Sequence, residues 1–526
     1  MMSSSSKNNG ALTLCAVAVV ASLSTFFVCS SLNRRSVRRR SATEASEDEA
    51  RRKARDDKQE AEGKPKGRLM NNMKIDEVYL WEVEHLSKQF ASTSKIPNAM
   101  SNGVAYNKLI SSDEVIIADI KQSPSAAAHS RAYVRAGPRR ELHFDPKEVT
   151  AAIVTCGGLC PGLNNVIREL TNSLYHLYGV DKVLGVRGGY AGFYTDGWDP
   201  IALTPEVVSN IHHEGGTFLG SSRGGFDLSA TVSFLRKHRV DQLYVIGGDG
   251  THRGAFRIHE ECMRLGVRVG VAGIPKTIDN DVDYIDRSFG FSSAVQAAQA
   301  AIRTAKTEAA CNLPNGVGVV KLMGRHAGFV AVHAAMGSGD VDLCLVPEVP
   351  IVMEGEKGCL PFLKRRVEEQ GYAVVVVAEG AGEELLGEST EADKSGNKKL
   401  PAIGQFLKKE IESYFGRHVP GGATVKYVDP SYMIRSCPAN AADSLYCMQL
   451  AQNAVHGLMA GYTGFSVGCC NNRMVLLPIP ELVATSPRRM DCWGRTWERV
   501  LSLTRQPNTA EKKKKGEGSH YAPMLR

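Results

Sequence analysis

The sequence lacks the cysteine spacing that a structural zinc site or a disulfide framework needs. It has 13 cysteines in 526 residues but no CxxC pair, and its closest pairs are Cys156 with Cys160 and the adjacent Cys469 and Cys470. Cysteines without a ligand spacing are most often small apolar core residues in a reducing compartment. Zinc-stabilised domains and small disulfide-rich scaffolds are therefore disfavoured.

A basic central region is also absent, although the formal net charge of the chain is +8. The first 70 residues hold 14 Lys and Arg against 8 Asp and Glu, and residues 505–526 hold 6 against 2, which leaves −2 for the middle. The positive charge thus lies in terminal arms, without a basic face interleaved with aromatic residues. No nucleic-acid partner is expected.

Charge is missing altogether from a run of 22 residues near the N-terminus, Ala11 to Leu32, which is followed by NRRSVRRR. The run fits a cleaved signal sequence, the first half of a bipartite organelle-targeting signal, or a membrane anchor. Its serine and threonine content weakens the anchor interpretation, and the arginine-rich flank would keep the following chain on the cytoplasmic side. We predict an apolar targeting or anchor segment at residues 1–33, with membrane contact only through residues 11–32.

Three further segments are predicted to lie outside the main domains. Residues 34–70 consist mostly of charged and small residues, which cannot bury enough apolar surface to fold, so we expect a disordered charged linker. Residues 71–148 mix short apolar pieces and are expected to form an N-terminal extension that packs on a neighbouring part. Residues 504–526 form a basic tail. For the chain between these segments we predict a cytoplasmic location, with a plastid or a membrane-anchored position as alternatives.

Between Val149 and Leu503, short apolar runs alternate with longer amphipathic stretches. The runs are AAIVT, QLYVIGG, VRVGVAGI, GVGVVKL, DLCLVP and YAVVVVAEG. This alternation is typical of parallel strands joined by crossover helices. We predict an α/β fold of two open, mostly parallel-sheet lobes with flanking helices, residues 149–310 and 311–503, with some exchange of chain between them. Ligands of such sheets bind beyond the carboxyl ends of the strands, which puts an active site in the cleft between the lobes.

Two glycine-rich stretches could hold phosphate groups. In TCGGLCPGLNNVIREL, the glycines let backbone amides approach an anion at the start of a helix, although a plain strand-to-helix turn explains the pattern equally well. In FLGSSRGGFD, Arg223 could reach over a phosphoryl group from a flexible loop, and an exposed polar turn is the alternative.

Charged residues follow three other apolar runs. Asp249 in YVIGGDGT is suited to hold Mg²⁺ between phosphate oxygens. GIPKTIDND packs one lysine and two aspartates together after VRVGVAG, and Arg325 of KLMGRHAGF could pair with a phosphate dianion as a planar fork.

Taken together, the motifs resemble the 6-phosphofructokinase family, most closely its plant- and protist-type members. GGLCPGLNNVIREL, GGDGTHRGA, GIPKTIDNDVDYIDRSFGF, KLMGRHAGF, VVAEGAG and YVDPSYMIRSC occur in the order of the family and span roughly residues 150–450. The resemblance implies a homo-oligomer, dimer or tetramer, that uses ATP and Mg²⁺ to phosphorylate fructose 6-phosphate. It implies an ATP-binding lobe at residues 149–310 and a sugar-phosphate-binding lobe at residues 311–503.

The resemblance also implies residue roles. Asp279 would accept the proton of the sugar hydroxyl, Asp281 would assist, and Arg325 completes the catalytic set. Asp249 and Asp281 would hold Mg²⁺. The residues implied for ATP are Gly157, Gly158, Arg223, Gly224, Gly248, Asp249, Gly250 and Thr251. The residues implied for fructose 6-phosphate are Lys276, Thr277, Ile278, Asp279, Met323, Gly324, Arg325, Glu379, Tyr432, Met433, Ile434 and Arg435.

The chain departs from the bacterial pattern of the family at three positions. Leu159 stands where bacterial members have an aspartate, and Gly316 and Lys426 stand where they have arginines that complete the sugar-phosphate site between subunits. Neither that shared site nor bacterial-type allostery can therefore be carried over.

Two residues bear on the identity of the phosphoryl donor, and they indicate different donors. Lys276 is typical of pyrophosphate-using members, but those members carry aspartate where this chain has Gly250, and a carboxylate there would repel the α-phosphate of ATP. ATP is the predicted donor. A pyrophosphate-dependent enzyme and a catalytically silent regulatory subunit that binds sugar phosphate are the alternatives.

Overall fold

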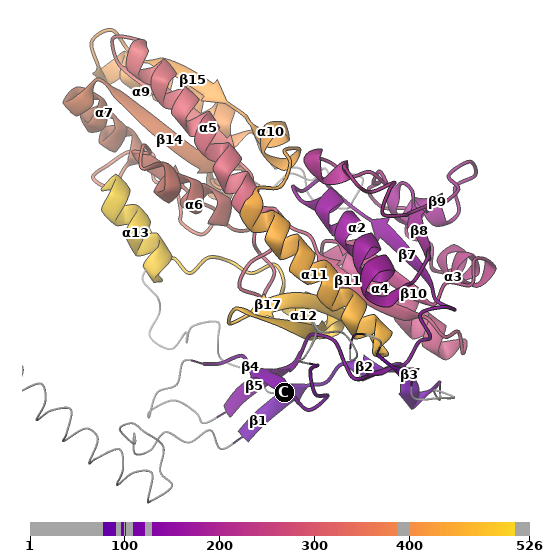
Figure 1. The fold of residues 1–526 in the computed structure, drawn as a ribbon. Coiled ribbons are helices and arrows are strands. Elements are labelled where there is room, and N and C mark those ends of the chain that lie inside the picture. Colours follow the sequence, from indigo (N-terminus) through magenta and orange to yellow (C-terminus); the bar gives the residue numbers. More distant parts are fainter. Residues whose placement is uncertain are drawn as a thin grey trace, which may run out of the picture. The chain divides into compact units, whose positions relative to one another are not determined.

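The structure, a computed structural model, describes residues 77–90, 96–98, 100, 109–120, 129–387 and 400–510. Within these residues the larger sheet has ten strands in the order β1-β5-β18-β17-β11-β10-β7-β8-β9, with β4 paired to β5 (Figure 1). The strands are β1 Glu77–Trp81, β4 Val115–Ile117, β5 His129–Arg135, β7 Thr150–Thr155, β8 Lys182–Val186, β9 Ile201–Ala202, β10 Gln242–Gly247, β11 Gly270–Pro275, β17 Phe465–Cys470 and β18 Arg473–Pro478. The run β8-β7-β10-β11-β17 is parallel.

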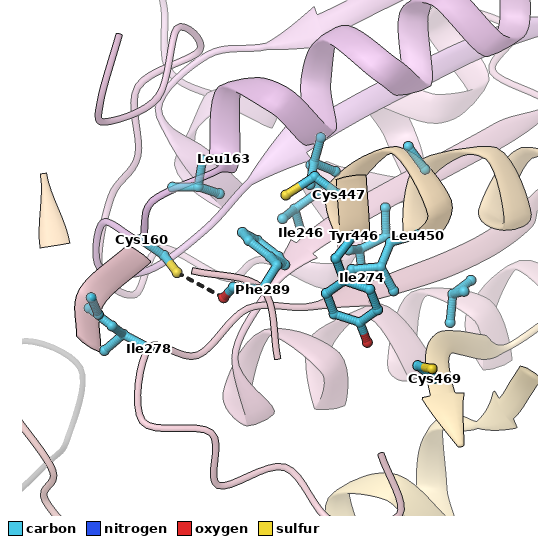
Figure 2. Close-up of a cluster of buried hydrophobic side chains, with 14 of the residues drawn as sticks. Cys160, Leu163, Ile246, Ile274, Ile278, Phe289, Tyr446, Cys447, Leu450 and Cys469 are labelled. Carbon is cyan, nitrogen blue, oxygen red and sulfur yellow. Dashed lines mark hydrogen bonds between the residues drawn. The ribbon is translucent and has the colours of Figure 1, made fainter. Parts of the chain in front are cut away.

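Helices cover both faces of this sheet, which is why the central strands β10, β11 and β17 are buried at every position. On β10, Tyr244 and Ile246 join the core under α2 and α11, whereas Leu243 and Val245 join the core under α3 and α4. Figure 2 shows part of the first core, with Ile246 and Ile274 in one cluster with Cys447 and Leu450 of α11. The helices are α2 Leu163–Asn172 with its π-helical extension η3 Ser173–Tyr178, α3 Leu228–Lys237, α4 Asp249–Arg264, α11 Ala441–Met459 and α12 Ile479–Thr485.

The second sheet has four parallel strands in the order β13-β14-β12-β15. It too is covered on both faces, by α5 and α6 on one side and by α7 and α9 on the other. Its elements are β12 Gly316–Leu322, β13 Leu343–Leu345, β14 Tyr372–Ala378, β15 Thr424–Val428, α5 Phe291–Cys311, α6 Phe329–Ser338, α7 Cys359–Gln370, α8 Glu383–Leu386, α9 Ile403–His418, α10 Ser431–Arg435 and α13 Arg495–Thr504.

The remaining elements are short, and two small antiparallel sheets pair β16 with β2 and β3 with β6. They are β2 Glu84–His85, β3 Ile96–Pro97, β6 Glu141–Leu142, β16 Tyr462–Thr463, η1 Leu86–Lys88, η4 Gly189–Phe193 and η5 Ile211–His213.

The predicted α/β class with mostly parallel sheets is confirmed, and each quoted apolar run contains a strand. After building the second sheet the chain returns to the first one through β17 and β18. Strands β1, β4 and β5 of the predicted N-terminal extension also belong to the first sheet, since β5 pairs with β18. Residues from both ends of the chain therefore complete the sheet that carries most of the motifs.

Several predictions concern residues outside the described ones. The apolar segment at residues 1–33, the linker at 34–70 and most of the basic tail, from residue 511 on, belong to this group. Within the described residues, no helix combines the length and apolar character needed to cross a membrane. The eleven cysteines described there are free, and eight of them are buried, which agrees with the interpretation of most of them as apolar core residues. Burial raises the pKa of one of these, Cys156, to about 12.

Candidate functional site

Three of the motif loops leave neighbouring strands at the same edge of the first sheet. Strand β10 lies between β7 and β11, and its register aligns Ile246 with Thr155 and Gly247 with Pro275. The loops that follow, which start with the glycines of TCGG, with GGDGT and with PKTIDND, are therefore side by side. This placement agrees with the rule that ligands of parallel sheets bind beyond the carboxyl ends of the strands.

Lys276 joins two of these loops. Its Nζ donates a hydrogen bond to the carbonyl oxygen of Gly158 at 2.6 Å, and the residue is only 8% exposed. Burial lowers the pKa of Lys276 from its usual value. A buried cation at this point strengthens attraction to an anion because water screens it little.

The loop that carries Arg223 closes over the first glycine loop. Ser221 Oγ donates a hydrogen bond to the carbonyl oxygen of Gly157 at 2.6 Å. Between the loops lies a cavity of about 450 Å³, lined by Gly157, Gly158, Leu159, Gly216, Thr217, Gly220, Ser221, Ser222, Arg223 and Arg435. Residues predicted for two different ligands, Arg223 and Arg435, thus line one cavity. Sequence reasoning missed Gly216 and Thr217, which come just before FLGSSRGGFD, although the adjacent glycines of GGTFLGSSRGG were the available signal.

The two aspartates of PKTIDND have different surroundings. Thr277 Oγ1 donates to Asp281 Oδ1 at 2.7 Å and accepts from the backbone N of Asp279 at 3.1 Å. Asp279 Oδ1 is buried and has no hydrogen-bond partner among the described residues. Burial, and then the negative charges of Asp281 and Glu379, raises the pKa of Asp279 well above its usual value. Such a carboxyl group is ready to take up a proton.

Asp249 is the first residue of α4 and lies near the carboxylate of Asp281. Burial, followed by the charge of Asp281, raises the pKa of Asp249 to about 6. Among the described residues no three His, Cys, Asp or Glu side chains gather to hold a metal ion. Magnesium at a nucleotide, however, takes one or two carboxylates and completes its shell with phosphate oxygens and water, so this pair of mutually repelling carboxylates fits it.

The second sheet brings the other predicted residues to the site. Met323, Gly324 and Arg325 follow β12, and a backbone hydrogen bond from Arg325 acts on the carboxyl group of Asp279. Gly324 has a φ of 130°, and a Cβ there would lie 2.5 Å from the carbonyl oxygen of Ala327, so the turn requires glycine. Glu379 follows β14, and burial raises its pKa against the opposing effect of Lys321 and Arg325.

The residues of helix α10 that are predicted to bind the sugar phosphate differ in their exposure. Tyr432 and Met433 are exposed at 73% and 72%, whereas Ile434 is completely buried. The side chain of Ile434, like that of Ile278 in Figure 2, belongs to the core, so only the backbone at these two positions can face a ligand. The guanidinium of Arg435 lies 4.9 Å from the ring centre of Tyr432 and turns towards the cavity described above.

Comparison with known proteins shows the family of this chain. The profile of the family described as "Phosphofructokinase" matches residues 150–458. The chain belongs to the phosphofructokinase family. It is 44% identical over 438 residues to the protein named ATP-dependent 6-phosphofructokinase 1 of Arabidopsis thaliana, covering 82% of this chain and 91% of that protein. It is also 44% identical over 443 residues to ATP-dependent 6-phosphofructokinase 4, chloroplastic, of the same plant, covering 82% of each chain.

A solved structure shares the phosphofructokinase fold. The crystal structure of a pyrophosphate-dependent phosphofructokinase from Marinobacter aquaeolei matches with a TM-score of 0.57 at 19% identity, covering 70% of this chain and 94% of that chain. At this level of identity the likeness concerns the fold alone.

One departure from the bacterial phosphofructokinase pattern has a local physical reason. Gly316 begins β12, and a Cβ there would lie 1.9 Å from the carbonyl oxygen of Ala309 in α5. No side chain fits without moving the helix, so no arginine can occupy this position in the present packing. Lys426 lies on the neighbouring strand β15, aligned with Gly318.

Proposed function

We propose that this chain phosphorylates fructose 6-phosphate at the 1-hydroxyl with Mg-ATP, giving fructose 1,6-bisphosphate and ADP, the committing step of glycolysis. The observation that carries the proposal is the buried carboxyl group of Asp279, whose Oδ1 has no partner among the described residues and whose pKa is raised. Cationic residues from both sheets surround it, as phosphoryl transfer requires.

In this reaction Asp279 accepts the proton of the 1-hydroxyl while the sugar oxygen forms its bond to the γ-phosphorus. The bond between the γ-phosphorus and the bridging oxygen breaks, and that oxygen leaves with ADP. Thr277 holds Asp281 by its 2.7 Å hydrogen bond and so orients the carboxylate next to the acceptor. Asp249 and Asp281 would hold Mg²⁺, which neutralises phosphate charge when it is bound.

In the proposed assignment the two ligands bind to different loops, which meet at one cavity. The glycine loop, Arg223 and the start of α4 would bind the phosphates of ATP, because backbone amides at a helix start favour anions. The residues at 323–325, Glu379 and α10 would bind fructose 6-phosphate, with Arg325 and Arg435 on its phosphate. Lys276 of PKTIDND, which donates a hydrogen bond to the glycine loop, would contact the transferred phosphoryl group.

Gly250 is proposed to decide the donor. A Cβ at this position meets nothing within 4 Å, so packing does not require glycine and an aspartate would fit. The substitution Gly250→Asp is expected to reduce kcat/KM for ATP by about 100-fold or more, because its carboxylate would repel the α-phosphate at short range. The matched variant Gly250→Ala adds bulk without charge and should keep most of the ATP activity.

The test measures kcat/KM for ATP and for pyrophosphate with the full chain, at saturating fructose 6-phosphate and fixed Mg²⁺. Preference of the wild type for ATP supports the proposal. Preference for pyrophosphate would favour the alternative that Lys276 suggests, and absence of product with either donor would favour a silent regulatory subunit. If Gly250→Asp and the wild type have the same kcat/KM for ATP, Gly250 does not decide the donor.

Assembly and location are also proposals. We infer a homo-oligomer, a dimer or a tetramer, which light scattering on the purified chain would measure. The catalytic region is proposed to work in the cytoplasm. A plastid location is the alternative suggested by the resemblance to a relative named chloroplastic, and imaging of a tagged full chain separates the two.

A further inference from the structure

The segment after α12 contacts the backbone of the PKTIDND loop. The backbone N of Arg488 donates to the carbonyl oxygen of Asp281 at 2.6 Å, and Arg488 Nη2 donates to the carbonyl oxygen of Asn280 at 3.2 Å. Ser486 Oγ accepts from the backbone N of Asp283 at 3.4 Å. Residues 486–488 therefore follow the loop that contains both aspartates and hold it from outside.

The same segment also contacts the loop that follows β12 in the second sheet, through Glu348. The backbone N of Met490 donates to Glu348 Oε1 at 2.8 Å, and the carboxylate of Glu348 also accepts from the backbone N of Gly328 at 3.1 Å. Gly328 lies in MGRHAGF, next to Phe329, and the guanidinium of Arg488 lies 5.0 Å from the ring centre of Phe329. Residues 486–490 thus join the loop of Asp279 to the loop of Arg325.

The contact of Arg488 falls on a residue whose backbone needs support. Asn280 has a φ of 57°, in the left-handed region that non-glycine residues adopt at a cost. Its side-chain Oδ1 accepts from the backbone N of Ser288 at 2.8 Å, while its carbonyl oxygen is held by Arg488. Because Asn280 stands between Asp279 and Asp281, its conformation sets the orientation of the two carboxylates relative to each other.

We propose that Arg488 is a positioning residue for the reaction, which holds Asn280 in its left-handed conformation and thereby aims Asp279. The inference rests on the proposed function and extends it to a residue beyond the range 150–458 that the family profile matches. The arginine combines two tasks that the geometry requires. It donates a hydrogen bond to a carbonyl oxygen while its planar group stacks on Phe329.

The test is a double-mutant cycle between Arg488→Met and Asp279→Asn in the full chain. In the wild-type background Arg488→Met is expected to lower kcat about 10- to 100-fold, with KM for both substrates changed less than about threefold, because a misplaced acceptor loses rate rather than binding. In the Asp279→Asn background the same substitution should lower kcat less than about twofold. Arg488→Lys, which can donate but cannot stack a planar group, should recover part of the kcat.

The matched control is Arg495→Met, on an arginine whose side chain is 82% exposed and pairs only with Glu498 among the described contacts. It should leave kcat unchanged. Amide exchange at residues 277–283 should be faster in Arg488→Met and unchanged in Arg495→Met. Wild-type kcat in Arg488→Met, a loss confined to KM, or equal losses in both backgrounds of the cycle would overturn the inference. If the proposed function is wrong, the wild type will form no product. In that case amide exchange at residues 277–283 still tests whether Arg488 holds the loop.

Discussion

Burial and mutual repulsion set the chemistry of the carboxyl groups at this site. Asp249 and Asp279 both have a raised pKa, for which burial is the largest cause and the charge of Asp281 the next. A carboxylate that is costly to keep charged gains most from a proton or a divalent cation. The same surroundings can therefore serve a proton acceptor at one position and a metal ligand at the other.

For Asp279→Asn we expect kcat to fall by about 10²- to 10⁴-fold while the chain still binds fructose 6-phosphate, because an amide cannot accept the hydroxyl proton. Steady-state kinetics and a binding titration of the variant provide the measurement. Asp196→Asn, a change at an exposed aspartate, is the control for the loss of one negative charge. A kcat close to that of the wild type would show that another group accepts the proton.

The raised pKa of Asp249 leads to a prediction about stability and pH. A pKa raised from 3.8 to about 6 means that the folded state binds the proton more tightly than the unfolded state does. The resulting stability is present below about pH 4 and is lost as the pH rises through about 6. Without Mg²⁺, Asp249→Asn should therefore unfold about 1 to 3 °C above the wild type at pH 8, and the difference should shrink towards pH 5.

Thermal unfolding of both chains between pH 5 and pH 8 tests this expectation. Added Mg²⁺ should raise the midpoint of the wild type more than that of Asp249→Asn, since the cation binds the charged carboxylate. A variant that is less stable than the wild type at pH 8 would contradict the assignment.

The contact between strand β12 and helix α5 depends on glycines. The Cβ of a residue at 316 would lie 1.9 Å from the carbonyl oxygen of Ala309, and one at 318 would lie 2.7 Å from that of Ala305. The strand and the helix therefore approach more closely than side chains would allow. This approach holds the start of β12 against α5, and the loop with Arg325 follows the other end of the same strand.

Gly316→Ala is expected to destabilise the protein by about 1 to 3 kcal/mol, because the added methyl group overlaps the helix backbone. The matched change Gly416→Ala lies on an exposed position of α9 where a Cβ meets nothing within 4 Å. It should stabilise the protein by about 0.5 to 1 kcal/mol, the usual gain of alanine over glycine in a helix. Denaturant unfolding of both variants measures the difference, and equal stabilities would contradict the close approach.

The first sheet depends on chain segments from both ends of the molecule. Strand β17 is hydrogen-bonded to β11 on one side and to β18 on the other, and β18 in turn pairs with β5. A chain that ended at residue 458, where the match to the family profile ends, would expose the edge of β11 and part of the core. The residues after 458 are therefore part of the domain and also supply Arg488.

Truncation tests this dependence. A chain that ends at residue 458 is expected to lose its soluble yield and cooperative unfolding, whereas a chain that ends at residue 510 keeps every element of the first sheet and should unfold like the full chain. Circular dichroism and the apparent midpoint of unfolding provide the comparison. A folded, soluble chain of residues 1–458 would show that β17 and β18 are dispensable.

The sequence by itself determined the fold class and which motif loops lie together at the candidate site. Continuous apolar runs identified the buried parallel strands because such strands face helices on both sides, and motifs placed directly after them had to lie at one edge of the sheet. For this reason the sequence could indicate Asp249, Lys276 and Arg325 as candidate site residues. Each follows the end of a strand within a few residues, so each must lie close to the sheet edge where that strand ends.

Only the tertiary structure decided which distant segments meet. The short apolar pieces before residue 149 gave no sign that one of them, β5, pairs with β18, because strand pairing over more than 300 residues leaves no local pattern. The core positions of Ile278 and Ile434 depend on helices that pack from elsewhere in the chain, so their motifs could not show that only their backbones face the site. Arg488 likewise stands in an irregular segment, and its contact with Asn280 exists only because the chain returns to the first sheet before reaching it.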